Sequence, residues 1–393
     1  SIVTFYDPDL LVGWEPERGS FGLLIQRGKV LQIPVAAYLS KLNGPAGIAE
    51  AEAASLRGGG NGSGNGRDRR SNAAPLSVRG RVALAGWKCC RREVALPHYS
   101  QAACVYHILH TRLPVYSSAT MQQWLRSPLH CHRALAACDE ATVANLRLLR
   151  TLNILPQTAE LSRVFGIEFQ AVLSRGSQYR VESVMVRAAH GQGYVMLSPS
   201  RGQVAGQRAL ECVPLIMEPR THFYTSPVLV LDFQSLYPSV MIAYNLCYST
   251  CLGKKAPAHA PTAVPPFGCA SLQQSSLSIP ASWSEAEDVF ETSNGVRFVK
   301  AHRRRGILPQ LLHEILRTRI MVKQSMKRNR GAKASPALER MLHARQMALK
   351  MIANVTYGYT SASYSGRMPH VDIADSIVKT GRDTIEAAIQ LIE

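Results

Sequence analysis

Two long amphipathic segments near the carboxyl end constrain the fold more than any other feature. Residues 337–357 have helical periodicity, and so do residues 308–330, with apolar side chains at Leu308, Leu311, Leu312, Ile315 and Val322. The stretch that joins the two segments, residues 329–336, is short, polar and contains glycine. Gly358 is placed to end the second helix. The pattern therefore predicts an antiparallel helical hairpin.

This hairpin region is strongly basic. Residues 302–350 hold thirteen Lys or Arg and only two acids, which is 13 − 2 = +11 of the total formal charge of +18. Four of the cations follow i, i+4, i+8 and i+11 and so share one helical stripe: Arg319, Lys323, Lys327 and Arg330. Such a stripe repels itself unless an anion lies along it, which favours a nucleic acid over a solvated helix face. No apolar run approaches the ~20 residues that span a membrane, which excludes a membrane protein.

A second informative segment precedes the hairpin. Residues 226–233 form a short β-branched run, predict a buried strand, and place Asp232 near its end. The turn that follows, residues 235–239, could begin a helix whose backbone amides face an anion. A carboxylate at a strand end is more often a cap or turn residue. Beside free backbone amides, however, a carboxylate suits a magnesium-bound triphosphate, because the carboxylate can bind the Mg²⁺ ion while the amides bind phosphate oxygens.

Two motifs carry a family resemblance. Leu-Asp-Phe-Gln-Ser-Leu-Tyr-Pro-Ser at 231–239 is similar to motif A of the family B DNA polymerases, and Lys-Met-Ile-Ala-Asn-Val-Thr-Tyr-Gly at 350–358 is similar to their motif B. The resemblance implies a multi-domain α/β (α+β) chain. Its RNase H-like, exonuclease-type domain would precede a palm sheet that carries the helical hairpin as fingers. Further segments resemble a translesion branch of the family: 165–169, 174–183, 214–219, 249–253 and 323–327.

The resemblance also implies roles for individual residues. Asp232 and the Phe233 carbonyl would bind one of two Mg²⁺ ions. The backbone amides of Ser235, Leu236 and Tyr237 would hold the triphosphate, and the Tyr237 ring would crowd a 2′-hydroxyl, although such a ring can also be an ordinary core aromatic.

On the predicted hairpin, Lys350 and Arg319 would reach the β- and γ-phosphates and Asn354 would assist them. Tyr357 would pack near the nascent base pair. Lys350, Asn354 and Tyr357 stand at i, i+4 and i+7 and share a face. Primer-template DNA would contact a further set: Lys323, Lys327, Arg330 and Gly358.

The amino-terminal part departs from the proofreading members. Where the second exonuclease motif should end in Phe-Asp, this chain reads Ser20-Phe21-Gly22, and the aligned third motif has Ala137 and Ala141 at its key positions. Asp139 and Glu140 lie so close to these alanines that a two-residue shift in the alignment would place an acid at a key position. Because a two-metal nuclease needs several carboxylates, we expect no proofreading and a translesion rather than a replicative role.

The expected organisation follows the resemblance and the composition. Glycine-rich residues 44–77 predict a flexible insertion, and residues 254–282, rich in Ala, Pro and Ser, predict a surface excursion. The expected domains are a degenerate exonuclease-like domain (1–155), a connection (156–225), the palm with motif A (226–305), the fingers (306–357) and a return to the palm (358–393).

Motif C, the family's other source of metal-binding carboxylates, is expected after Glu393, and Asp372 and Asp375 lie in the wrong context to replace it. We therefore expect a polymerase piece that is inactive alone. The alternative is a non-catalytic relic that binds primer-template DNA. Deoxynucleoside triphosphates and DNA are the expected ligands. Accessory subunits and an iron–sulfur cluster are expected only outside this chain. Only the resemblance implies a nuclear location, since the arginines at 303–305 better suit phosphate contact than a localisation signal.

Overall fold

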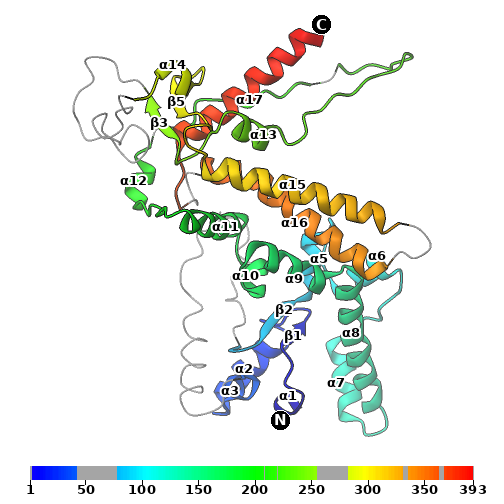
Figure 1. The fold of residues 1–393 in the computed structure, drawn as a ribbon. Coiled ribbons are helices and arrows are strands. Elements are labelled where there is room, and N and C mark those ends of the chain that lie inside the picture. Colours follow the sequence, from blue (N-terminus) through cyan, green and yellow to red (C-terminus); the bar gives the residue numbers. More distant parts are fainter. Residues whose placement is uncertain are drawn as a thin grey trace. The chain divides into compact units, whose positions relative to one another are not determined.

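A computed structural model describes residues 2–41, 78–207, 209–218, 220–254, 282–330, 335–362 and 367–392. The expected insertion at 44–77 lies outside these residues, as does the 254–282 excursion apart from its two end residues. The chain divides into two compact units, Ser1–Leu155 and Pro156–Glu393. Helices and strands occur in both units (Figure 1). In the part that the structure describes, no helix combines the length and apolar character needed to cross a membrane.

The first unit holds a small parallel sheet among helices. Strand β1 (Leu10–Gly13) pairs with β2 (Val82–Ala85), with Leu10 opposite Val82. The helices are α1 (Ile2–Tyr6), α2 (Phe21–Val30), α3 (Val35–Leu39), α5 (Gly86–Glu93), α6 (Gln101–Leu109), α7 (Ser118–Arg126) and α8 (Cys131–Thr151). One core cluster joins α5, α6 and α8 through Cys90, Cys104 and Leu148.

The alternation at residues 80–95 predicts strands, and this expectation is wrong beyond Ala85. Helix α5 begins at Gly86, directly after β2. Cys89 and Cys90 are adjacent and both are buried. A strand would send these two side chains to opposite faces, whereas a helix turns both toward the core. The spacing of apolar residues at 142–154 and 158–165 predicts helices, and these residues lie in α8 and α9 apart from a turn at residues 152–153.

The second unit combines a three-stranded antiparallel sheet with helices. The strands β3 (Cys251–Lys254), β4 (Val289–Glu291) and β5 (Val296–Val299) lie in the order β3-β5-β4. The helices are α9 (Ile154–Phe165), which begins at the unit boundary, α10 (Phe169–Ser174), α11 (Ser177–Gly191), α12 (Arg201–Ala205), α13 (Leu236–Ala243), α14 (Glu285–Asp288), α15 (Ile307–Arg328), α16 (Pro336–Ser361) and α17 (Val371–Ile392).

The predicted helical hairpin is present as α15 and α16, which lie side by side in Figure 1. The apolar stripe of α15 is buried, with Leu312 fully inaccessible to solvent. Across the join, the Asn329 side-chain amide donates to the Ser335 carbonyl at 3.2 Å. Ser335 in turn caps α16 by accepting from the Leu338 amide at 3.4 Å. Polar residues at the join therefore fix the start of the second helix.

Gly358 does not end the second helix, contrary to the sequence expectation, because α16 continues to Ser361. Side-chain hydroxyl groups donate hydrogen bonds to carbonyls in the last turns of the helix. Thr360 donates to the Tyr357 carbonyl at 2.7 Å and Ser361 to the Gly358 carbonyl at 3.2 Å. These bonds support another turn of helix, and glycine costs only about 1 kcal/mol within one.

The predicted buried strand at 226–233 is also wrong. These residues form no strand, and Leu229 and Val230 are 83% and 84% exposed. Figure 1 shows the green segment before α13 as an extended arm that leaves the helices and returns to them. A strand needs a neighbour to pair its backbone groups. Among the described residues no segment pairs with this one, so its β-branched sequence has no sheet to join.

Candidate functional site

The arm returns to the body of the second unit at the start of α13. Ser235 has a left-handed backbone (φ 56°) and α13 begins at Leu236. The amides of Leu236 and Tyr237 lie in the first turn, where a helix supplies no acceptor, and Pro238 has no amide hydrogen. The Ser239 amide donates to the Ser235 carbonyl at 2.9 Å, so the regular ladder starts there. The amides of Leu236 and Tyr237 therefore have no acceptor within the helix, which is the arrangement at which helix N-termini can bind anions.

Asp232 lies three residues before this turn. Its side chain is exposed and forms no hydrogen bond or ion pair with the residues that the structure describes. Phe233 beside it is 45% exposed. A free carboxylate and a backbone carbonyl are suitable ligands for Mg²⁺. However, no three His, Cys, Asp or Glu side chains within the described ranges are grouped as a metal site. The residues present thus fit one part of a cation site.

The rings of Tyr237 and Tyr357 meet at the centre of the candidate site. They stack with centroids 4.7 Å apart and planes 27° from parallel. Burial raises the pKa of both phenols, so both remain neutral and protonated at physiological pH. This contact joins the first turn of α13 to the last turns of α16. The structure therefore brings one residue of each predicted motif together.

The other predicted nucleotide contacts lie along the helical hairpin. Lys350 and Asn354 are exposed on α16, on the turns that precede Tyr357. Arg319 on α15 is half-buried, and its Nε donates to Oε1 of Gln346 on α16 at 3.2 Å. That bond holds the Arg319 side chain across the hairpin while its terminal amino groups remain available as donors.

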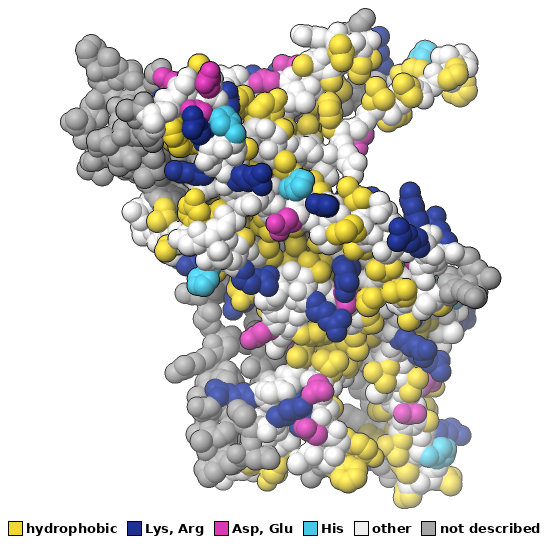
Figure 2. Space-filling model, viewed as in Figure 1, with side chains coloured by type: hydrophobic (Ala, Val, Ile, Leu, Met, Phe, Trp, Pro, Cys, Tyr) yellow, Lys and Arg dark blue, Asp and Glu magenta, His cyan; other side chains and the backbone are white. Residues whose placement is uncertain are grey.

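The predicted DNA contacts lie farther along the same hairpin. Lys323, Lys327 and Arg330 are exposed, and none forms an ion pair with a described residue. Figure 2 shows dark blue side chains gathered over the carboxyl-terminal end of α15. Gly358 is half-buried, and a Cβ placed on it would meet nothing within 4 Å. Packing inside this chain therefore does not require glycine there.

Some cations of the basic region form ion pairs with buried acids inside the protein. Arg303, which we expected to contact phosphate, instead donates through Nε to the buried Asp288 carboxylate at 2.7 Å. His302 approaches the same oxygen at 2.8 Å, and these contacts hold the pKa of Asp288 well below its usual value. Arg345 on α16 pairs with the buried Glu160 of α9 at 2.8 Å. Among the described residues, Arg303 and Arg345 are thus neutralised by acids of this chain, unlike Lys323, Lys327 and Arg330 on and after α15.

The first unit shows no nuclease-like set of carboxylates in its described residues. A Cβ at Gly22 would lie 1.8 Å from the Glu17 carbonyl oxygen, so no aspartate fits at this position. Ala137 and Ala141 lie on α8 with the exposed Asp139 and Glu140. These two acids line a cavity of about 540 Å³ together with Arg112 and Arg147. Two acids beside two arginines do not form a two-metal centre.

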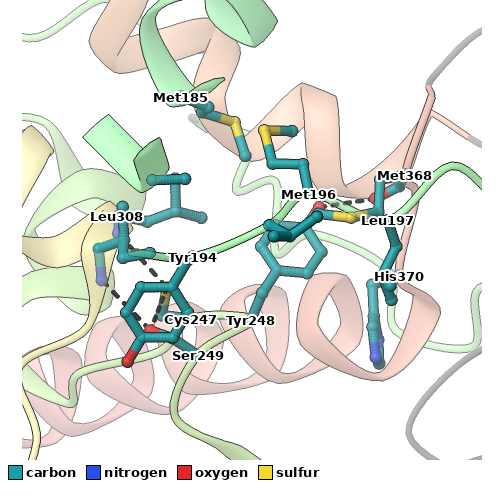
Figure 3. A pocket seen from close by; sticks show the side chains of 13 residues that line it. Met185, Tyr194, Met196, Leu197, Cys247, Tyr248, Ser249, Leu308, Met368 and His370 are labelled. Carbon is teal, nitrogen blue, oxygen red and sulfur yellow. Dashed lines mark hydrogen bonds between the residues drawn. The ribbon is translucent and has the colours of Figure 1, made fainter. Parts of the chain in front are cut away.

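An apolar cavity of about 300 Å³ lies elsewhere in the second unit (Figure 3). Methionine side chains at 185, 196 and 368 line it together with Tyr194, Leu197 and His370. Two of its polar groups have partners within the protein: Tyr248 donates to the Met368 carbonyl at 2.8 Å, and the Ser249 hydroxyl accepts from the Ile307 amide at 3.3 Å. None of the predicted site residues lines this cavity.

The sequence prediction missed two sets of residues. Asn245, Cys247 and Ser249 hold the first turn of α15, and their alternating polar pattern is the only sequence signal for this. Gly381 on α17 lies against Tyr237. A glycine inside a long amphipathic helix would have been its signal.

Comparisons with known proteins identify the family of this chain. Residues 167–393 match the profile of DNA polymerase family B. The human DNA polymerase zeta catalytic subunit is 42% identical to this chain, covering all of the chain and 12% of the human protein. The corresponding Saccharomyces cerevisiae subunit is 37% identical, with 100% of this chain and 25% of that protein covered. The bovine DNA polymerase delta catalytic subunit is 31% identical, with 32% of its length covered.

A solved structure shows the same fold. The family B DNA polymerase from the hyperthermophilic archaeon Pyrobaculum calidifontis matches with a TM-score of 0.62 at 23% identity, over 100% of this chain and 44% of that one. The chain is thus similar to zeta-type catalytic subunits, the branch of the family that the five further segments resemble. The chain spans only 12% to 25% of the zeta relatives. On its matched residues and its identity to these relatives, the chain belongs to DNA polymerase family B.

Proposed function

We propose that this chain carries the incoming-nucleotide side of a DNA polymerase active site. The whole protein would add deoxynucleotides to a primer 3′-hydroxyl under the direction of a template. The observation that carries the proposal is the stack of Tyr237 on Tyr357. It joins two motifs 120 residues apart, and Lys350 stands two turns before Tyr357 on the same helix, α16.

Each residue then has a role in the reaction. The amides of Leu236 and Tyr237 donate to triphosphate oxygens, with Ser235 setting the turn that aims them. Lys350 and Arg319 balance the charge of the β- and γ-phosphates, and Asn354 adds a hydrogen bond. Asp232 and the Phe233 carbonyl would hold a divalent cation, which when bound lowers the pKa of the primer hydroxyl and stabilises the departing pyrophosphate.

The Tyr237 ring selects the sugar of the incoming nucleotide. Its face rests on Tyr357, which fixes the position of the ring below the sugar. A 2′-hydroxyl would crowd this ring, whereas a deoxyribose would not. Tyr357 would also contact the nascent base pair. Lys323, Lys327, Arg330 and the backbone at Gly358 would contact primer-template DNA through its phosphates.

We further infer a translesion role without proofreading, in the nucleus, with accessory subunits bound by other parts of the protein. Gly22, Ala137 and Ala141 support the lack of proofreading because none can ligate a metal. The similarity to zeta-type subunits supports the translesion role.

The 393 residues alone should not extend a primer, because the described residues contain no group of three His, Cys, Asp or Glu side chains that could hold a metal ion. The competing proposal is a non-catalytic DNA-binding relic, which the free cations at 323, 327 and 330 would serve equally well. The two proposals differ in what Asp232 does.

The test is Asp232→Asn in the full-length protein. We expect single-nucleotide addition to fall by at least about 10³-fold, because the isosteric amide loses the charge that binds the cation. Primer-template affinity should stay within about twofold, since Asp232 lies apart from the basic stripe. Asp139→Asn, an exposed carboxylate of the first unit, is the matched control and should leave addition unchanged. Full addition by Asp232→Asn would refute the metal assignment, and DNA binding without addition by the unmodified protein would support the relic.

A further inference from the structure

Helix α17 presents a glycine to the ring of Tyr237. Gly381 is buried in this helix, where glycine is less favourable than alanine. A Cβ at this position would lie 3.2 Å from Cε1 and 3.5 Å from Cδ1 of Tyr237. Carbon atoms normally approach to about 3.5–4.0 Å. The edge of the ring thus occupies part of the space that a side chain at 381 would need.

The ring is limited on a second side as well. Tyr357 of α16 stacks on one face with centroids 4.7 Å apart. Leu236 also lies near, with its Cδ2 3.8 Å from the same Cβ position. The buried sides of the Tyr237 ring therefore face α16 and α17. A new methyl group at 381 would displace the ring away from α17, and the side of the ring that faces neither helix is its exposed side.

We propose that Gly381 is a specificity-determining residue that sets the depth of the Tyr237 ring and thereby the space for the sugar of the incoming nucleotide. The inference rests on the proposed contact between Tyr237 and that sugar. A methyl group at 381 moves the ring a few tenths of an ångström outward. This narrows the site for the sugar. The narrowing hinders a ribonucleotide more than a deoxynucleotide, because the 2′-hydroxyl of the ribonucleotide needs more space.

The experiment compares Gly381→Ala, Tyr237→Ala and the double variant in the full-length polymerase, by steady-state incorporation of a deoxynucleotide and of its ribonucleotide. Gly381→Ala should raise KM for the deoxynucleotide about three- to tenfold with kcat little changed, and should increase discrimination against the ribonucleotide. In the Tyr237→Ala background the same change should have no further effect. Gly191→Ala is the control, because a Cβ at this helical glycine meets nothing within 4 Å.

The outcomes separate this inference from the proposed function. Unchanged discrimination in Tyr237→Ala would refute the role of Tyr237 itself. Two results would refute the role of Gly381 alone, provided that Tyr237→Ala increases ribonucleotide use. One is an unchanged KM in Gly381→Ala. The other is an equal effect of Gly381→Ala with and without the Tyr237 ring. If Gly381→Ala fails to fold, the double variant decides, because removal of the ring removes the clash. Restored folding would support the contact, and continued misfolding would overturn it.

Discussion

Burial of His370 illustrates how a single residue couples this fold to pH. The imidazole lines the apolar cavity and is 8% exposed. Burial lowers its pKa from the usual 6.5 to about 4, against the opposing effect of the Asp372 carboxylate. The folded protein therefore holds a neutral ring at pH values where the unfolded chain binds a proton.

The sign of the pH effect follows from this difference. Between about pH 6.5 and 4 the unfolded state binds more protons, so the free energy of unfolding should fall as the pH is lowered, by up to about 1.4 kcal/mol per pH unit from this group. Urea unfolding of His370→Leu at several pH values should show a shallower dependence in this window. His343→Leu, at an exposed position on α16, is the control. An equal slope in wild type and His370→Leu would contradict the assignment.

At the scale of an element, α15 begins without a side-chain cap of its own. Its N-cap residue is Gly306, and residues 245–249 supply the missing acceptors. The Gly306 amide donates to Oδ1 of Asn245 at 2.9 Å, and the Leu308 amide donates to Sγ of Cys247 at 3.3 Å. Nδ2 of Asn245 also donates to the Val299 and Arg304 carbonyls at 2.7 and 2.8 Å. One buried amide thus ties α15 to β5 and to the loop between them.

Asn245→Gly should lower the free energy of unfolding by about 2–4 kcal/mol, because it leaves one amide and two carbonyls without their partner. Glycine retains the left-handed backbone (φ 58°) that Asn245 adopts. Asn245→Ala should cost about 1 kcal/mol more through that strain. Denaturant unfolding followed by circular dichroism measures both, with the exposed Gln324→Ala on α15 as the control. A loss below about 1 kcal/mol in Asn245→Gly would show that the cap is not needed.

The contrast between elements explains what the sequence could predict. The hairpin was predictable because its apolar spacing and the polar join at Asn329 and Ser335 are local signals. The segment at 226–233 was not, because a β-branched run becomes a strand only when a partner pairs with it. Of the candidate site, the motif residues could be named from the sequence. The glycine at 381 is a local signal inside a long helix, but its contact with Tyr237 depends on the packing of α17 against α13, which the sequence does not show.

At the scale of the whole molecule, the formal charge of +18 is unevenly distributed. Many basic side chains outside the hairpin have acidic partners, such as Lys379 with Asp383 at 3.1 Å and Arg382 with Glu386 at 2.7 Å on α17. The exposed cations toward the end of α15 have no acidic partner in the described residues. Removing a cation that has an acidic partner changes the net charge as much as removing one that has none. A comparison of DNA binding by the two kinds of variant therefore distinguishes a local contact with DNA from the effect of overall charge.

The matched pair of double variants is Lys323→Gln with Lys327→Gln and Lys379→Gln with Arg382→Gln. If α15 lies along the DNA backbone, the first pair should reduce the slope of log affinity against log salt concentration by about 2. The reason is that the variant makes two fewer phosphate contacts, so fewer counterions leave the DNA on binding. The second pair should leave the slope nearly unchanged, although it removes the same charge. Fluorescence anisotropy with labelled primer-template DNA at several salt concentrations measures both slopes. Equal reductions would mean that net charge attracts the DNA without a contact along α15.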